Sequence, residues 1–116
     1  MTIQRFHIGP RLSEMAIHNG TIYLAGQVAT DTTQDMGGQT AQVLAIIDRL
    51  LAEAGSDKTK ILSTTIYITD MADFPAMNAV WDAWVVAGAT PPRATVTAQL
   101  AKSAYKVEIQ LIAAII

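Results

Sequence analysis

The stretch "RFHIGPRLSEMAIHNGTIYLAGQVA", residues 5–29, decides the class of fold. Short runs in it alternate between apolar and polar residues, as strands do when one face is buried. Asn19-Gly20 stands between two of these runs, and both residue types accept the positive φ angles of a tight hairpin turn. Gly9-Pro10 interrupts the pattern earlier. We therefore predict that the chain begins with short strands joined by turns.

Two helices are predicted further along the chain. From Gln39 to Ala54 the apolar residues follow the helical period, and Gly55 can end this helix in the left-handed conformation. A second helix is predicted from Asp73, as its N-cap, to Gly88. The remaining strands are predicted at 60–69, 93–100 and 105–115. The order βββαβαββ predicts an α+β fold in which two helices cover one face of a mixed sheet.

The composition predicts one small, very apolar domain. The chain has 116 residues, of which 51% are hydrophobic and 16% are charged. This length is typical of a single domain, which we place at 1–116. A domain of this size cannot bury so many apolar side chains alone, so we expect an oligomer whose interfaces complete the core. The alternative is a monomer with an ordinary apolar surface.

Several classes of protein are disfavoured by the sequence. The net charge is −2 and there is no basic run, which argues against a nucleic-acid partner. No signal-peptide pattern and no apolar stretch of membrane-spanning length is found, so we expect a cytoplasmic protein without a membrane partner. The chain has no cysteine, which excludes disulfides and thiol catalysis. His7 and His18 are isolated, so no metal site is expected.

The segment "TPPRATVTAQL", residues 90–100, raises a separate question, because a predicted strand in this apolar chain begins with Arg93. In the predicted strand, Arg93 lies on the face opposite to Ala94 and Val96. On the last strand, Glu108 lies on the face opposite to an apolar set of residues. If the apolar set of each strand packs on the helices, Arg93 and Glu108 both lie on the helix-free face. They could form a solvated ion pair there, worth about 0–1 kcal/mol. They could instead form part of a functional site.

The chain resembles the Rid family of reactive-intermediate deaminases, also called the YjgF family, over nearly its whole length. The segments that carry the resemblance are "GTIYLAGQVATD" (20–31), "AGSDKTKILSTTIYITDMADFPAMNAVWDAW" (54–84), "PPRATV" (91–96) and "YKVEIQLIAAI" (105–115). Within the family it is similar to a short branch with an RxS motif, here Arg11-Leu12-Ser13. The resemblance implies a chorismate-mutase-like fold and a homotrimer built around a central barrel, which would bury the helix-free face.

The resemblance also implies which residues form the site, in clefts between neighbouring subunits. Arg93 matches the arginine that grips a substrate carboxylate, and Glu108 matches the glutamate associated with the reacting water. Asn78 matches an asparagine near the same cleft, and Gly26 matches the glycine of the "GQ" strand end that lines it. Arg93 and Glu108 are thus the expected catalytic residues, and Arg93, Gly26 and Asn78 are expected to bind substrate.

The chemistry of these residue types agrees with the implied reaction. A guanidinium offers two parallel N–H groups to a carboxylate, and a carboxylate can orient a water and take its proton. The substrates implied are small carboxylates of the 2-imino or 2-enamino acid class, such as 2-aminoacrylate. Hydrolysis would yield a 2-oxo acid and ammonia. No metal or organic cofactor is expected.

The sequence departs from the family pattern at three places. Arg11 stands where the well-described deaminases have a tyrosine, Ala25 where many have a serine, and Ala94-Thr95 replaces a Ser-Cys pair. We expect Arg11 and Thr95 to contact the substrate. The departures leave two functions open: an imine or enamine hydrolase, and a module that binds small carboxylates or 2-oxo acids without turnover. The older family labels of translation inhibition and ribonuclease action are disfavoured by the acidic chain.

Overall fold

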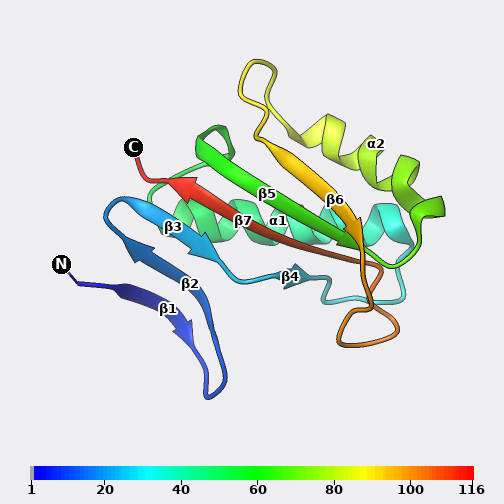
Figure 1. Ribbon diagram of the computed structural model, residues 1–116, viewed down its shortest axis with the longest axis horizontal. Helices are drawn as coiled ribbons and strands as arrows, with labels where there is room; N and C mark the ends of the chain where they lie inside the picture. The colour runs from blue at the N-terminus through cyan, green and yellow to red at the C-terminus, as the bar shows by residue number, and fades with distance from the viewer. Residues whose placement is uncertain (1) are drawn as a thin grey trace.

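The computed structural model describes residues 2–116, and Figure 1 shows a twisted sheet with both helices on one side of it. The strands are β1 (Gln4–Ile8), β2 (Ser13–His18), β3 (Thr21–Leu24), β4 (Gln27–Val28), β5 (Ile61–Ile68), β6 (Arg93–Thr97) and β7 (Val107–Ala114). The helices are α1 (Met36–Glu53) and α2 (Phe74–Trp84), with 3₁₀ turns at Lys58–Lys60 and Met71–Asp73. The predicted mixed sheet with two helices is therefore confirmed, with β4 as an additional short strand.

The seven strands form one sheet in the order β1-β2-β3-β7-β5-β6, and β4 pairs with β7. Every pair is antiparallel except β5 and β6, which are parallel and are connected through α2. Parallel neighbours need such a crossover, because the chain must return to the same end of the sheet. The crossover makes β6 one edge of the sheet, and the hairpin of β1 and β2 forms the other edge (Figure 1).

The local signals at the first hairpin and the first helix act as predicted. Asn19 and Gly20 have φ angles of 54° and 75° and connect β2 to β3. Gly55, with a φ of 79°, follows the end of α1. Helix α1 begins at Met36, earlier than the apolar period indicated, because the Asp35 carboxylate accepts a hydrogen bond of 2.9 Å from a backbone N–H of the first turn.

The second helix differs from its prediction at both ends. It ends at Trp84 and not at Gly88, because Val85 already has an extended backbone with a ψ of 156°. Gly88 has a φ of 83° and belongs to the turn beyond. Asp73 occupies the N-cap position without a side-chain cap bond, while the Asp70 carboxylate caps the preceding 3₁₀ turn. The second helix is therefore present as predicted, but it ends four residues before Gly88.

The core lies between the sheet and the helices, and the opposite face of the sheet is left open. Alternate residues of β5 and β7 are buried with the inner residues of α1 and α2. On the open face Tyr23 pairs with the half-buried Ile112, and its side chain is 47% exposed. Val96 of β6 is 41% exposed. A single chain therefore leaves some apolar side chains exposed on the open face of its sheet.

Candidate functional site

The expected site residues separate into two groups on opposite faces of the sheet. On β5, Thr64 and Ile66 are buried against the helices, and the parallel register pairs them with Arg93 and Thr95. Paired residues share a face, so Arg93 and Thr95 face α2. Glu108 of β7 alternates with the buried core residues of that strand and lies on the open face. The prediction that both charges lie on the helix-free face is correct for Glu108 and wrong for Arg93.

The error at Arg93 came from assigning the faces of β6 by polarity. Polarity predicts that Ala94 and Val96 are the buried set, but both residues are exposed on the open face. A guanidinium can occupy the helix side of an edge strand, because the aliphatic stem of arginine packs on apolar groups while its head stays accessible. The cross-strand ion pair with Glu108 is thereby excluded within one chain.

Arg93 is held by two aromatic rings of α2. Its guanidinium carbon lies 5.3 Å from the centre of the Trp81 ring and 5.8 Å from that of Phe74. These distances are typical of cation–π contacts. The N–H of Thr64 bonds to the carbonyl of Pro92 at 3.0 Å and aligns the start of β6. Within residues 2–116 the Arg93 side chain forms no hydrogen bond or ion pair, so its donors are free for an anion.

Three buried polar atoms without hydrogen-bond partners lie on the elements that surround Arg93. They are Thr64 Oγ1, Asn78 Oδ1 and Thr95 Oγ1, each unpartnered among the described residues. Asn78 is half-buried and follows Phe74 and precedes Trp81 at helical spacing, so it shares the α2 face on which Arg93 rests. Buried polar atoms of this kind are rare in folded proteins. The elements around Arg93 therefore carry three described polar atoms that are available for hydrogen bonds to a ligand.

Thr64 is the residue of this group that sequence reasoning missed. It sits in a strand that reads as an ordinary β-branched segment, so its hydroxyl drew no attention. The sequence feature that indicates it is the position of Thr64 in the inward–outward alternation of the strand. Thr64 belongs to the inward set with Ile66 and Ile68, and it is the polar member of that otherwise apolar set.

The second group consists of Gly26 and Glu108. The half-buried Glu108 carboxylate lies directly against the backbone of Gly26, where a Cβ would overlap its Oε2 and come within 2.8 Å of its Cδ. Only glycine leaves this space free. Among the described residues Glu108 forms no hydrogen bond or ion pair, so its oxygens can accept from a water or a ligand. The structure thus places Gly26 and Glu108 side by side, and their role in a site stays a prediction.

Arg11 joins neither group within the chain. It is exposed in the turn between β1 and β2, which a hydrogen bond of 2.8 Å from Gly9 N–H to the Leu12 carbonyl closes. No hydrogen bond or ion pair links Arg11 to another described residue. Its expected contact with substrate is therefore not made by this single chain.

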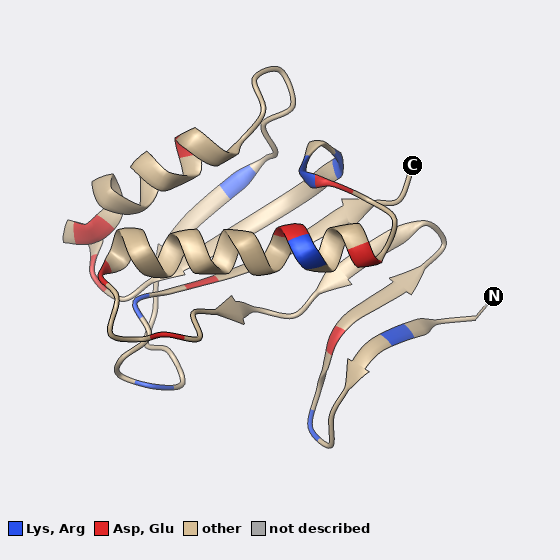
Figure 2. Cartoon of the chain, turned by 180° about the vertical axis from the view of Figure 1, so that it is seen from behind, with Lys and Arg blue, Asp and Glu red and all other residues tan. Residues whose placement is uncertain are grey.

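Charge is sparse on the sheet, as Figure 2 shows. The charged residues on the described strands are Arg5, Glu14, Arg93 and Glu108. Two of these four are the expected catalytic residues. Residues 2–116 contain no cluster of three or more His, Asp and Glu side chains suited to a metal ion. In the same part of the chain, no helix combines the length and the apolar character that crossing a membrane requires.

Comparison with known proteins identifies the family. A family model described as Endoribonuclease L-PSP matches residues 2–115. The RutC family protein YoaB of Escherichia coli is 49% identical over 115 residues, which cover 99% of this chain and 100% of that protein.

Solved structures agree with this match. A member of the YjgF protein family from Neisseria meningitidis, NMB1025, is 50% identical, with a TM-score of 0.95 over 98% of this chain and 95% of that chain. YyfA of Yersinia pestis, from the conserved Rid protein family, is 34% identical, with a TM-score of 0.83 over 92% of this chain and 89% of that chain. The resemblance in the sequence is thus confirmed, and the chain belongs to the Endoribonuclease L-PSP family, the YjgF or Rid family.

Proposed function

We propose that this protein hydrolyses reactive 2-imino and 2-enamino acids, such as 2-aminoacrylate, to 2-oxo acids and ammonia, in clefts between the subunits of a homotrimer. One observation carries the proposal. Among residues 2–116, the Arg93 guanidinium on one face of the sheet and the Glu108 carboxylate on the other form no ion pair. Two such groups cannot meet within one chain, but they can meet when two copies associate.

Association also accounts for the uncovered surface. The open face exposes Tyr23 and Val96, and β6 is an edge strand whose outer backbone groups have no partner strand. Such edges and apolar faces are usually covered in native proteins. A second copy laid on this face would bring its own site residues to the Gly26–Glu108 group. The family resemblance supplies the number of copies, three.

The reaction uses each group for a separate task. Arg93 binds the substrate carboxylate through two parallel N–H donors, and the amide of Asn78 and the hydroxyl of Thr95 offer further polar contacts. Glu108 of the neighbouring copy accepts a proton from a water molecule while the water oxygen attacks the imine carbon. The proton then passes from Glu108 to the nitrogen, which gives a carbinolamine. Its hydroxyl proton moves through Glu108 to the nitrogen as the carbon–oxygen double bond forms and the carbon–nitrogen bond breaks, and the 2-oxo acid and ammonia leave. An enamine substrate first takes a proton on carbon to become the imine.

The test is a rate measurement on a freshly generated imine. A pyridoxal-phosphate dehydratase acting on L-threonine produces the enamine in the cuvette, and release of 2-oxobutanoate is followed with and without this protein. We expect acceleration over the uncatalysed rate, and its loss in Arg93→Ala and Glu108→Gln. Arg5→Ala, which alters an exposed arginine on β1, is the matched control and should retain the rate.

Two outcomes contradict the proposal. If the wild type gives no acceleration but binds 2-oxobutanoate saturably, the protein is a binding module without turnover. The departures at Ala25 and Ala94-Thr95 make this the alternative to test. If Arg5→Ala lowers the rate as much as Arg93→Ala does, the assigned anion site is in the wrong place.

A further inference from the structure

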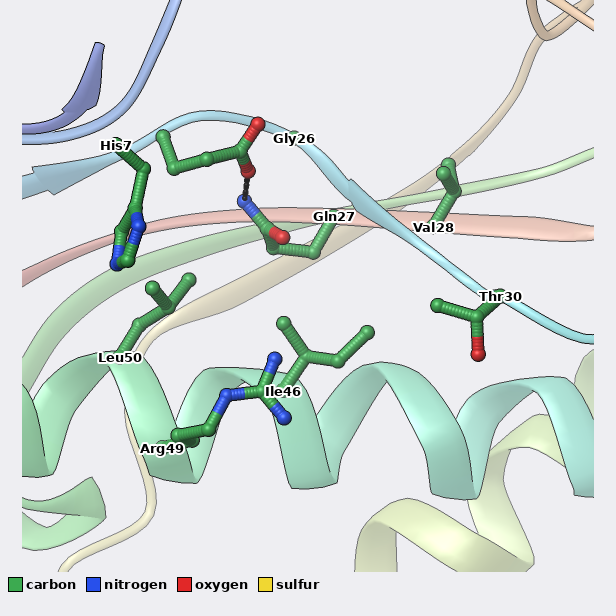
Figure 3. Close-up of a pocket in the computed structure, with 9 residues that line it drawn as sticks. His7, Gly26, Gln27, Val28, Thr30, Ile46, Arg49 and Leu50 are labelled. Carbon is green, nitrogen blue, oxygen red and sulfur yellow. Dashed lines mark hydrogen bonds between the residues drawn. The ribbon is translucent and has the colours of Figure 1, made fainter.

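A cleft of about 390 Å³ lies between β1, β4 and α1, apart from the Arg93 and Glu108 groups (Figure 3). Neither Arg93 nor Glu108 lines it, and Gly26 is the one residue it shares with the groups described above. Its volume lies within the range of small-molecule sites, about 300–1,000 Å³. Apart from Gly26, no residue of the proposed hydrolysis site lines this cleft.

His7, which lines the cleft from β1, has a left-handed backbone and contacts Glu53 of α1. His7 at the end of β1 has a φ of 55°, a left-handed conformation that is uncommon outside glycine. Its imidazole lies 2.9 Å from one Glu53 carboxylate oxygen and 3.0 Å from the other, which connects β1 to α1 across 46 positions of sequence. Strain of this kind is kept only where the surrounding contacts hold it, and it is common at binding sites.

The cleft presents one carboxylate in a fixed orientation. The Gln27 side chain, only 5% exposed, donates from Nε2 to Glu14 Oε2 at 2.8 Å and to the Ala25 carbonyl at 3.0 Å. These two bonds use both N–H groups of Gln27 and hold Glu14 by a single oxygen. The other Glu14 oxygen and Gln27 Oε1 accept no hydrogen bond from the described residues. They are acceptors for a cationic group.

The opposite wall supplies a guanidinium and an apolar surface. Figure 3 shows the exposed Arg49 side chain extending along α1 with its guanidinium beside Ile46, while Gln27 and Val28 of β4 line the other side of the cleft. Arg49 forms no ion pair or hydrogen bond within residues 2–116. The cleft thus combines donors for a carboxylate, acceptors for an ammonium group and an aliphatic lining.

We propose that this cleft binds the zwitterion of an aliphatic α-amino acid. Arg49 takes the carboxylate, Glu14 and Gln27 take the ammonium, and the side chain packs on Val28, Ile46 and Leu50. Both charges are needed, because a 2-oxo acid offers Glu14 no cation. This site is independent of the proposed hydrolysis at Arg93.

The test is a titration followed by NMR of the methyl groups of Val28, Ile46 and Leu50. L-Leucine is expected to shift these signals saturably. Arg49→Ala and Glu14→Gln should each raise the dissociation constant at least about 10-fold, the value of one hydrogen bond to a charged group. Glu14→Gln keeps the shape and an acceptor for Gln27. Arg5→Ala, an arginine on β1 outside the cleft, is the matched control and should leave the affinity unchanged.

Two related ligands separate the charge requirements. 4-Methyl-2-oxopentanoate lacks the ammonium group and 3-methylbutylamine lacks the carboxylate, so both should shift the cleft methyls far less than L-leucine does. The proposal is overturned if L-leucine gives no saturable shift, if the 2-oxo acid shifts the same methyls equally, or if either cleft variant binds normally. Contacts between these methyls and a second copy of the chain would also overturn it, because the cleft would then be an interface.

Discussion

Replacing Arg93 by alanine separates an arginine that awaits a ligand from one that supports the fold. Within residues 2–116, Arg93 has two aromatic contacts, with Phe74 and Trp81, and no ion pair. Each cation–π contact is worth about 0.5–1 kcal/mol at a partly exposed site. Arg93→Ala should therefore lower the free energy of unfolding by about 1–2 kcal/mol. This corresponds to a decrease in Tm of less than about 10 °C.

The effect of the same substitution on ligand binding should be much larger. A carboxylate held by two charge-assisted hydrogen bonds loses at least about 100-fold in affinity when the guanidinium is removed. Arg93→Lys keeps the charge and the aromatic contacts but cannot reproduce the two-pronged geometry, so it should bind at least about 10-fold more weakly at nearly unchanged Tm. Thermal melting and calorimetric titration with 2-oxobutanoate measure the two quantities on the same samples.

The opposite pattern would refute this reasoning. Loss of one partner of a buried ion pair costs about 3–5 kcal/mol. If Arg93→Ala unfolds or dissociates the protein, a neighbouring copy supplies a structural carboxylate to Arg93. If Arg93→Ala folds and binds 2-oxobutanoate as the wild type does, the carboxylate site lies elsewhere.

Four further predictions follow from the geometry. Gly26→Ala should displace the Glu108 carboxylate and lower kcat at least about 10-fold while changing 2-oxobutanoate affinity little; an unchanged kcat would show that the position of Glu108 is unimportant. Thr64→Val removes a buried hydroxyl that has no partner among residues 2–116, so Tm should stay the same or rise in thermal melting, and a fall in Tm would show that this hydroxyl forms a hydrogen bond. Sedimentation equilibrium should give the mass of three 12.4 kDa chains, and a stable monomer would remove the intersubunit site. Hydrogen bonds from Thr59 lower the pKa of the Asp57 carboxyl in the folded protein. The contribution of Asp57 to stability is therefore present above the pKa that Asp57 has in the unfolded chain, and it is lost as the pH falls through the lowered folded-state pKa. Thr59→Val should raise the folded-state pKa of Asp57 in a carboxyl NMR titration.

Local chemistry made much of the fold predictable from the sequence. Asn19-Gly20 specifies its turn because those residues accept positive φ, and the apolar period that leads to Gly55 specifies α1. The family motifs placed Gly26 and Glu108 in the expected site, and the structure brings these two residues together. Signals of this kind depend on neighbours in sequence, so they can be read without a structure.

Tertiary structure decided what depends on pairing between distant segments. Alternation shows that Arg93 and Glu108 belong to definite faces of their strands, but only the register of β6 on β5 shows that these faces are opposite. That the Thr64 hydroxyl is buried without a partner among residues 2–116 follows only from the folded structure. The cleft at Arg49 is lined by β1, β2, β4 and α1, and His7 and Glu53, 46 positions apart, connect β1 to α1. Polarity along a strand reports that its two faces differ, whereas contacts with other elements determine which face is inside.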